Sequence, residues 1–209
     1  MKDLHITRRQ ILKGAGAAGL VSVLGAPVAA FADGDEGEGR GRVRWDLIRI
    51  VNGCVSPGGT SSAQAEHGAT IVMTGSGTFP NVRNRCVRGV TGGGTWAVSP
   101  SDPADSRCLP GSGNYRVTEL LSWTSAPDGH FPPFDDCIPG GTKATATAGL
   151  ALLRIKYDDG KSGTLTVDCH LPGSPDCMFE GITATREYVD FSHWLGGPTV
   201  FHFLTKDKD

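Results

Sequence analysis

The chain has 209 residues and a formal net charge of −2 at pH 7. Residues 1–32 form a predicted leader, and without them 177 residues remain, with 16 basic and 21 acidic side chains and a net charge of −5. That length suits one domain with a sizeable core. A nucleic-acid-binding domain would show a basic surplus or a basic stripe, so we expect no nucleic-acid partner.

The leader combines a basic start, the run TRRQILK at residues 7–13, a Gly/Ala-rich apolar stretch and the small-x-small site AFA at residues 30–32. This pattern resembles a twin-arginine export signal, cleaved after about Ala32. The resemblance implies a secreted or periplasmic protein whose partners are the twin-arginine export machinery and signal peptidase. The alternatives are an ordinary secretory signal or a membrane anchor. No other stretch is long and apolar enough to cross a bilayer, so we expect no stable membrane insertion after cleavage.

A flexible charged linker is predicted over residues 33–42 (DGDEGEGRGR), because it has no apolar residue to offset the ordering of its backbone. A single β domain is predicted over residues 43–205, followed by a charged tail over 206–209. The domain opens with VRWDLIRIV at 43–51, where apolar residues on both faces predict a strand covered on both sides. Residues 54–66, rich in Gly, Ser, Pro and Ala, are predicted to form a loop.

Two glycine-rich segments echo each other, TGSGTF at 74–79 and TGGGTW at 91–96. The first ends a strand predicted over 69–79. We expect the two segments to pair, with glycines that permit sharp coiling and aromatics that cover the bare backbone. A phosphate-binding loop is the alternative, but no P-loop lysine and no following helix accompany either segment.

Glu119 stands out in the strand predicted over 114–123 (NYRVTELLSW). Strict alternation puts it on the apolar face Tyr115, Val117, Glu119, Leu121 and Trp123. A carboxylate there would have either a raised pKa or a basic partner. A raised pKa suits a general acid or base. The structural alternative is a buried ion pair with Arg154 or Arg186. The connection over 127–141 is long enough for a lid or a binding loop.

The central stretch predicts three consecutive antiparallel strands, over 150–157, 164–171 and 178–191, with the tight turn DDGKSG between the first two. A last strand is predicted over 199–204. About eight strands without helical periodicity predict an all-β antiparallel meander that forms a closed barrel or a barrel-like sandwich. Eight strands can enclose one small ligand. The side chains that we expect to contact it are Arg154, Arg186, Tyr115, Trp123 and Tyr188.

The six cysteines are Cys54, Cys86, Cys108, Cys137, Cys169 and Cys177. An even count in an exported chain indicates disulfides, although six cysteines permit about fifteen pairings. Cys169 and Cys177 form the natural local pair, and Cys86–Cys108 and Cys54–Cys137 follow by elimination. A metal cluster of Cys169, His170 and Cys177 is the alternative. Neighbouring strand residues point to opposite faces and no CxxC or HxxxH pair supports it, so we expect no metal and no cofactor.

A second polar group comprises Asp168, His170 and Glu180. Asp168 and His170 share a strand face and Glu180 starts the next strand, so a carboxylate could orient the imidazole as an acid/base pair. No GxSxG elbow accompanies them, and a solvent-facing polar row is the alternative. A weaker candidate for ligand contact is His193 beside Trp194, with Tyr188 and Asp190 near. Packing of an aromatic-rich strand end is the alternative.

The segments TGSGTF, TGGGTW, AGLALLRIKYDDG and EGITATREYVDF resemble those of small uncharacterised β-rich proteins exported by bacteria. The strand pattern is loosely similar to allene oxide cyclase-like, dirigent and lipocalin barrels, in architecture only. We therefore expect an exported, disulfide-stapled protein that binds a small, partly apolar ligand without catalysis. The alternatives are a hydrolase or cyclase that uses Glu119 or the Asp168, His170 and Glu180 group, and a structural or surface interaction module.

Overall fold

The computed structural model describes residues 41–102 and 104–204. The predicted leader, most of the predicted linker and the predicted tail lie outside these ranges. Within the described residues there is no helix of the length and hydropathy that a bilayer span requires. The helical segments there are two short 3-10 turns, η2 (Glu66–Gly68) and η3 (Ser106–Cys108).

The described part of the chain contains fifteen strands. They are β1 (Arg42–Val51), β2 (Cys54–Pro57), β3 (Ser61–Gln64), β4 (Thr70–Met73), β5 (Ser76–Pro80), β6 (Thr91–Ser99), β7 (Gly111–Ser125), β8 (Asp135–Asp136), β9 (Ala146–Thr147), β10 (Gly149–Tyr157), β11 (Ser162–Cys169), β12 (Gly181–Arg186), β13 (Val189–Phe191), β14 (His193–Gly196) and β15 (Thr199–Leu204).

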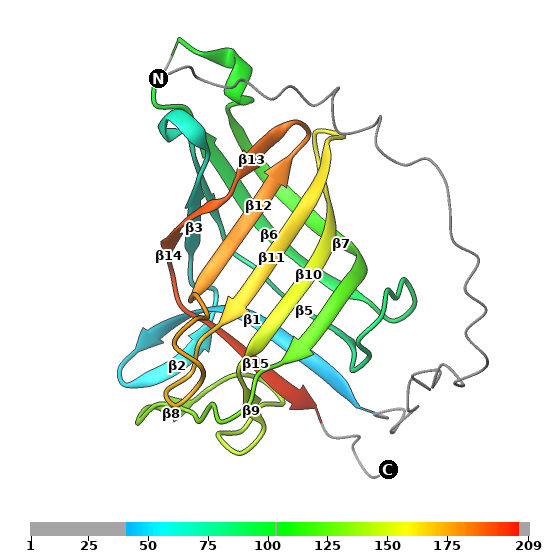
Figure 1. Ribbon diagram of the computed structural model, residues 1–209, viewed down its shortest axis with the longest axis vertical. Helices are drawn as coiled ribbons and strands as arrows, with labels where there is room; N and C mark the ends of the chain where they lie inside the picture. Colours follow the sequence, from blue (N-terminus) through cyan, green and yellow to red (C-terminus); the bar gives the residue numbers. More distant parts are fainter. Residues whose placement is uncertain (1–40, 103, 205–209) are drawn as a thin grey trace, which may run out of the picture. The chain divides into compact units, whose positions relative to one another are not determined.

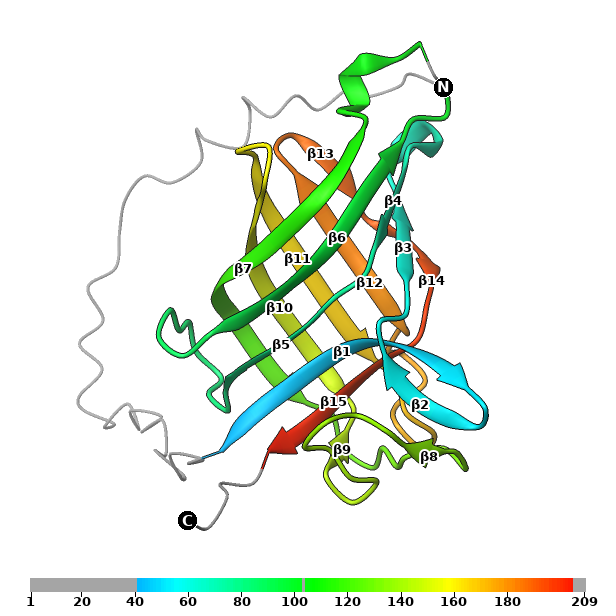
Figure 2. The ribbon, with the colours of Figure 1, turned by 180° about the vertical axis from the view of Figure 1, so that it is seen from behind.

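These strands form one large, mostly antiparallel sheet with the order β13-β12-β11-β10-β7-β6-β5-β1-β15-β9. Off this path, β4 pairs with β6, β3 with β4, β14 with β3, and β2 with β1. The short pairing of β2 with β8 is parallel. Figure 1 and Figure 2 show, from opposite sides, β10–β12 on one side of the sheet's interior and β3–β6 on the other. The sheet therefore coils around its own core.

The prediction of an all-β, antiparallel fold is confirmed, but a closed barrel is wrong. The strand order has two ends, at β13 and at the two-residue β9. At the first end, β13 covers only three residues of β12, after which the chain leaves at Ser192 and pairs with β3 as β14. The strand number also exceeds the prediction, because the stretches predicted over 69–79 and 178–191 are each broken and the predicted loops contain short strands.

The hairpin predicted in the central stretch is present. β10 and β11 pair from Gly149 opposite Cys169 to Lys156 opposite Ser162, and Gly160 takes a φ of 89° in the turn. β12 follows as the third neighbouring strand. β2 pairs with β1 in another hairpin, although β2 lies in the stretch 54–66 that the sequence predicts as a loop; Asn52 and Gly53, with φ of 52° and 77°, form the turn. An Asn-Gly pair favours such turns, so the signal was present in the sequence.

The two glycine-rich segments pair as predicted, with Gly77 opposite Gly92. The ring that covers them is Trp45 of β1, which is fully buried. A Cβ at Gly77 would lie 2.7 Å from the Trp45 indole nitrogen. The aromatics of the segments themselves pack elsewhere: Phe79 contacts Trp123 and Phe201 in the main core. Glycine is thus required here so that an aromatic side chain can lie directly on the backbone.

A smaller apolar cluster lies apart from the main core. Its buried members are Ile48, Val55, Ile138 and Val200. Phe131 and Phe134, from the long connection between β7 and β9, pack against it. Ile48 and Val200 come from β1 and β15, so the connection is attached to the sheet by apolar contacts as well as by hydrogen bonds.

Candidate functional site

An apolar pocket of about 200 Å³ opens beside this smaller cluster. Four parts of the chain build it: the β1–β2 hairpin, the start of the β7–β9 connection, the loop after β11 with the residue before β12, and the chain entering β15. Its lining residues are Ile48, Ile50, Val55, Phe131, Pro132, His170, Leu171, Pro172, Glu180, Pro198, Thr199 and Val200. Mostly apolar walls with a few polar groups are typical of small-molecule sites.

Glu180 is the only carboxylate among these lining residues. Its Oε2 accepts a hydrogen bond from the backbone N–H of His170, and its Oε1 accepts one from the backbone N–H of Thr199. The Thr199 hydroxyl lies 3.2 Å from the same Oε1 but donates over 2.8 Å to the carbonyl of Asp168. Glu180 therefore joins the loop after β11 to the start of β15, at the wall of the pocket.

Burial in this apolar wall raises the pKa of Glu180 to about 7, although the backbone donors of Thr199 and His170 lower it. Asp168, on β11, is 3% exposed. Desolvation raises its pKa to about 6, against a backbone hydrogen bond from Phe179 and the charge of His170. Each carboxylate thus loses hydration, and Asp168 also raises the pKa of Glu180 by charge repulsion.

The predicted group of Asp168, His170 and Glu180 is therefore brought together, but with a different internal geometry. Glu180 contacts the backbone of His170, while the imidazole Nε2 lies 3.4 Å from the carbonyl of Ser174. No carboxylate orients the imidazole within the described residues, because no ion pair joins His170 to Asp168 or Glu180. His170 and Glu180 line the pocket, whereas Asp168 is not among the lining residues.

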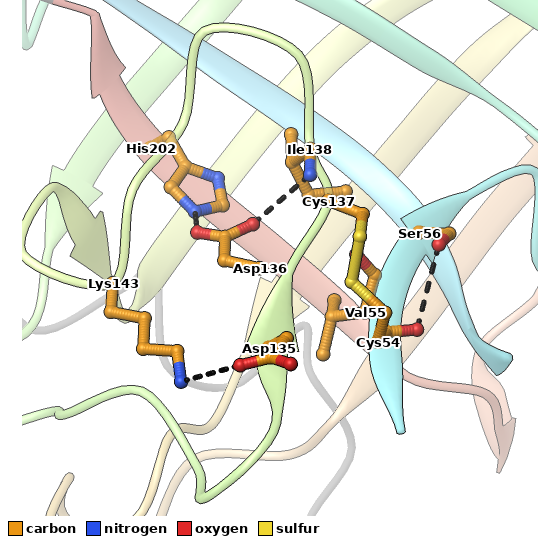
Figure 3. Close-up of a disulfide and its surroundings, with 9 residues drawn as sticks. All are labelled: Cys54, Val55, Ser56, Asp135, Asp136, Cys137, Ile138, Lys143 and His202. Atoms are coloured by element: carbon orange, nitrogen blue, oxygen red, sulfur yellow. Dashed lines mark hydrogen bonds and ion pairs between the residues drawn. A yellow bond between two sulfur atoms is a disulfide. The ribbon is translucent and has the colours of Figure 1, made fainter. Parts of the chain in front are cut away.

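The β7–β9 connection is held in place at two successive residues (Figure 3). Cys137 forms a disulfide with Cys54 of β2. Asp136 places Oδ2 3.0 Å from Nε2 of His202 on β15 and accepts a hydrogen bond of 3.1 Å from the backbone of Ile138. Since Val55 lies one residue beyond Cys54 and Phe131 lies on the same connection, these links fix two walls of the pocket relative to each other.

Glu119 is buried as predicted, but on the other face of the sheet. Thr118 and Leu121 are unpaired bulge positions between β7 and β10, so that Glu119 lies opposite Arg154. Cross-strand partners project to the same side, and Arg154 points outward. Glu119 pairs with Arg154 at 2.9 Å and with Arg85. These arginines lower its pKa, so the ion-pair alternative holds, and Glu119 is no high-pKa acid.

Arg85 is the partner that sequence reasoning missed. It reaches Glu119 because neighbouring Cys86 forms a two-way backbone bridge with Leu120, over 2.8 Å in each direction. This contact joins residues 34 positions apart through a segment without regular structure, and nothing in the local sequence pattern indicates it.

The five side chains predicted to contact a ligand do not lie together. Tyr115 and Trp123 belong to the main core, where their polar atoms bond to Thr74 and Asn81. Arg154 forms an ion pair with Glu119. Arg186 is 2% exposed, lies 4.1 Å over the ring of Trp96 and bonds to Leu109 and Asp159. Tyr188 is exposed and bonds to the carbonyl of Arg107.

Of the three predicted disulfides one is present, and the pairings Cys86–Cys108 and Cys169–Cys177 are not formed. Cys54–Cys137 is formed, but Cys86, Cys108, Cys169 and Cys177 are free thiols. Cys169 points into the core, with Sγ 3.4 Å from the Thr199 carbonyl, whereas Cys177 is exposed on the loop. This separation also argues against the alternative of a Cys169–His170–Cys177 metal cluster, and over residues 41–102 and 104–204 no three His, Cys, Asp or Glu side chains gather as a metal site.

Two other surface features are weaker candidates. Trp194 is half exposed and stacks on Phe179 with ring centroids 6.0 Å apart, and His193 lies 3.4 Å from Glu66. A shallow depression of about 470 Å³ lies over β4, β6 and β7, and none of its lining residues is charged. Neither combines an apolar wall with a half-buried carboxylate as the pocket beside Glu180 does.

Comparison of the chain with models of protein families, with curated proteins and with solved structures finds no match.

Proposed function

We propose that this protein binds a small, partly apolar molecule, without catalysis, in the pocket beside Glu180. The observation that carries the proposal is the pocket itself: about 200 Å³, walled by Ile, Val, Phe, Leu and Pro side chains, with few polar groups. Its walls come from four separate parts of the chain, and the disulfide and the Asp136–His202 pair hold two of them. A pocket fixed in this way loses little entropy on binding.

The test is a titration with benzyl alcohol, followed by the methyl NMR signals of labelled Ile and Val. We expect shifts in Ile48, Ile50, Val55 and Val200 and none in the core residue Ile182. An Ile50→Trp variant should weaken binding at least tenfold, because Ile50 lines the pocket and is 49% exposed, so the larger ring has room to fill the opening.

The matched control is Val51→Trp. Val51 is the next residue, is 42% exposed and does not line the pocket, so this variant should bind as the wild type does. Equal loss in both variants, or shifts spread over the main core, would contradict the proposal.

A second candidate is acid/base catalysis, as a hydrolase or cyclase. It is favoured by the raised pKa values of Asp168 and Glu180 beside a pocket that also contains His170. Against it, both oxygens of Glu180 accept backbone hydrogen bonds. Hydrolysis of p-nitrophenyl acetate that disappears in a stably folded His170→Ala variant, with benzyl alcohol binding retained, would favour the enzyme.

We also propose export through the twin-arginine route, on the basis of residues 1–32. The Cys54–Cys137 disulfide supports an oxidising compartment. Replacement of Arg8 and Arg9 by lysine should leave unprocessed precursor inside the cell, whereas replacement of Lys2 should not. Normal export of the double-lysine variant would contradict this route.

A further inference from the structure

Among the described residues, Glu180 has no basic side-chain partner. Of the buried and half-buried carboxylates there, Asp46 pairs with Arg44, Glu119 with two arginines and Asp136 with His202, but no ion pair includes Glu180 or Asp168. Burial of an anion without a counter-charge is costly, and a protein normally supplies the partner itself. At this pocket the described part of the chain does not.

Glu180 also has unused hydrogen-bonding capacity. A carboxylate offers about four acceptor positions. The backbone donors of His170 and Thr199 use two of them, and the Thr199 hydroxyl proton is directed to the Asp168 carbonyl over the shorter distance. About two positions remain for a donor that enters from the pocket.

We infer that the pocket selects a small protonated amine with an apolar group, whose ammonium lies against the Glu180 carboxylate and whose apolar part lies among Ile48, Val55 and Val200. This inference rests on the proposed function and specifies its ligand class. Phe131, in the same lining, offers an aromatic side chain, and aromatic rings attract cations that lie over their faces.

Other ionisable groups lie near Glu180: Asp168 and Cys169 on β11, and His170, which follows them. His130 of the β7–β9 connection lies next to Gly173 of the loop after β11. Asp168 adds negative charge near Glu180 and so favours a cation. Acid neutralises Glu180, and this weakens amine binding at low pH.

The experiment compares three probes that share one apolar body: benzylamine, benzyl alcohol and benzoate. They are titrated by calorimetry and by the same methyl signals, from pH 5 to pH 8. Wild type should bind benzylamine at least tenfold more tightly than benzyl alcohol at pH 8, and benzoate least. Because Glu180 must lose its proton to pair with the ammonium, benzylamine affinity should rise roughly 100-fold over this range while benzyl alcohol affinity stays level. Proton release at pH 7, seen as a dependence of the heat on the buffer, should accompany benzylamine alone.

Glu180→Gln should reduce benzylamine affinity to that of benzyl alcohol, with benzyl alcohol binding retained as the control for an intact pocket. If this variant fails to fold, the pH profile of the wild type decides alone. Benzyl alcohol or benzoate binding as tightly as benzylamine would overturn the amine inference and leave the binding function standing. Absence of binding by all three probes would overturn the proposed function itself.

Discussion

Asp136 and His202 form a buried pair, with 3.0 Å between the Asp136 carboxylate and the His202 imidazole and with side chains that are 4% and 0% exposed. Asp136 comes from the β7–β9 connection and His202 from β15, 66 residues later. Asp136 directly precedes Cys137, which forms the disulfide with Cys54. A connection that the sequence predicts as a lid or a binding loop is thus fastened by a covalent bond and by a buried ionisable pair.

Replacement of Asp136 by alanine should therefore destabilise the protein by about 2–4 kcal/mol, because the imidazole and the Ile138 N–H would lose their buried acceptor. Asp135→Ala is the matched control. Its ion pair with Lys143, at 3.3 Å, is exposed, so we expect a change below about 0.5 kcal/mol. Urea unfolding at pH 7.5 measures both. Similar losses of unfolding free energy in the two variants would show that the buried pair with His202 stabilises the protein no more than the exposed pair with Lys143 does.

Asp168→Asn should make the protein more stable relative to the wild type as the pH rises. The folded-state pKa of Asp168 is raised from 3.8 to about 6, so the folded state holds a proton that the unfolded state has released. That contribution is complete below about pH 4 and is lost as the pH rises through 6. The shift alone corresponds to about 3 kcal/mol, and we expect roughly half, because the structure relaxes around a buried charge.

The measurement is the free energy of unfolding of both proteins at pH 4, 5.5 and 7.5. Asp176→Asn, at an exposed position in the following loop, should not change the pH dependence. A wild-type advantage at pH 7.5 that exceeds the one at pH 4 would contradict the assignment.

The contrast between Glu119 and the β10–β11 hairpin shows what the sequence can predict about the fold. The hairpin follows from two apolar runs around Asp-Asp-Gly, and every part of that signal is local. Alternation also identified β7, but it assumed an unbroken period of two. Two bulges, at Thr118 and Leu121, turn Glu119 to the other face. Neither position has a residue type that marks a bulge, so local pattern could not place them.

The residues of the pocket also fall into those that the local sequence brings together and those that it does not. Glu180 and His170 are ten residues apart and were expected to meet across the loop that joins β11 to β12. Ile48, Val55 and Phe131 come from distant positions, and long-range contacts bring their segments there: the disulfide, the pairing of β2 with β8 and the pairing of β15 with β1. His202 did leave a signal, as a lone ionisable residue in the otherwise apolar strand TVFHFL, but its partner Asp136 could not be found from spacing.

Glu119→Gln should lower Tm at pH 7, by a difference that shrinks in acid. The pKa of Glu119 is lowered by hydrogen bonds from Arg85 and Arg154, so its contribution is present above about pH 4.5 and is lost as the pH falls through the lowered value. Scanning calorimetry from pH 3 to pH 7 measures the difference. Glu66→Gln, whose contact with His193 is exposed, serves as control. A Tm difference that does not depend on pH would indicate that charge is not what Glu119 supplies.

The number of free thiols distinguishes this fold from a fully cross-linked one. Unfolding without a reductant, followed by alkylation and mass spectrometry, should add four alkyl groups, and reduction should raise the number to six. In the folded protein Cys177 should react first, because it is exposed, and Cys169 last, because burial in the core raises its pKa and hides the thiol. Two labels without reduction would mean that a second disulfide forms. Since Cys169 points inward and Cys177 outward, a bond between them would require the loop that carries His170 and Glu180 to rearrange, and the pocket would change with it.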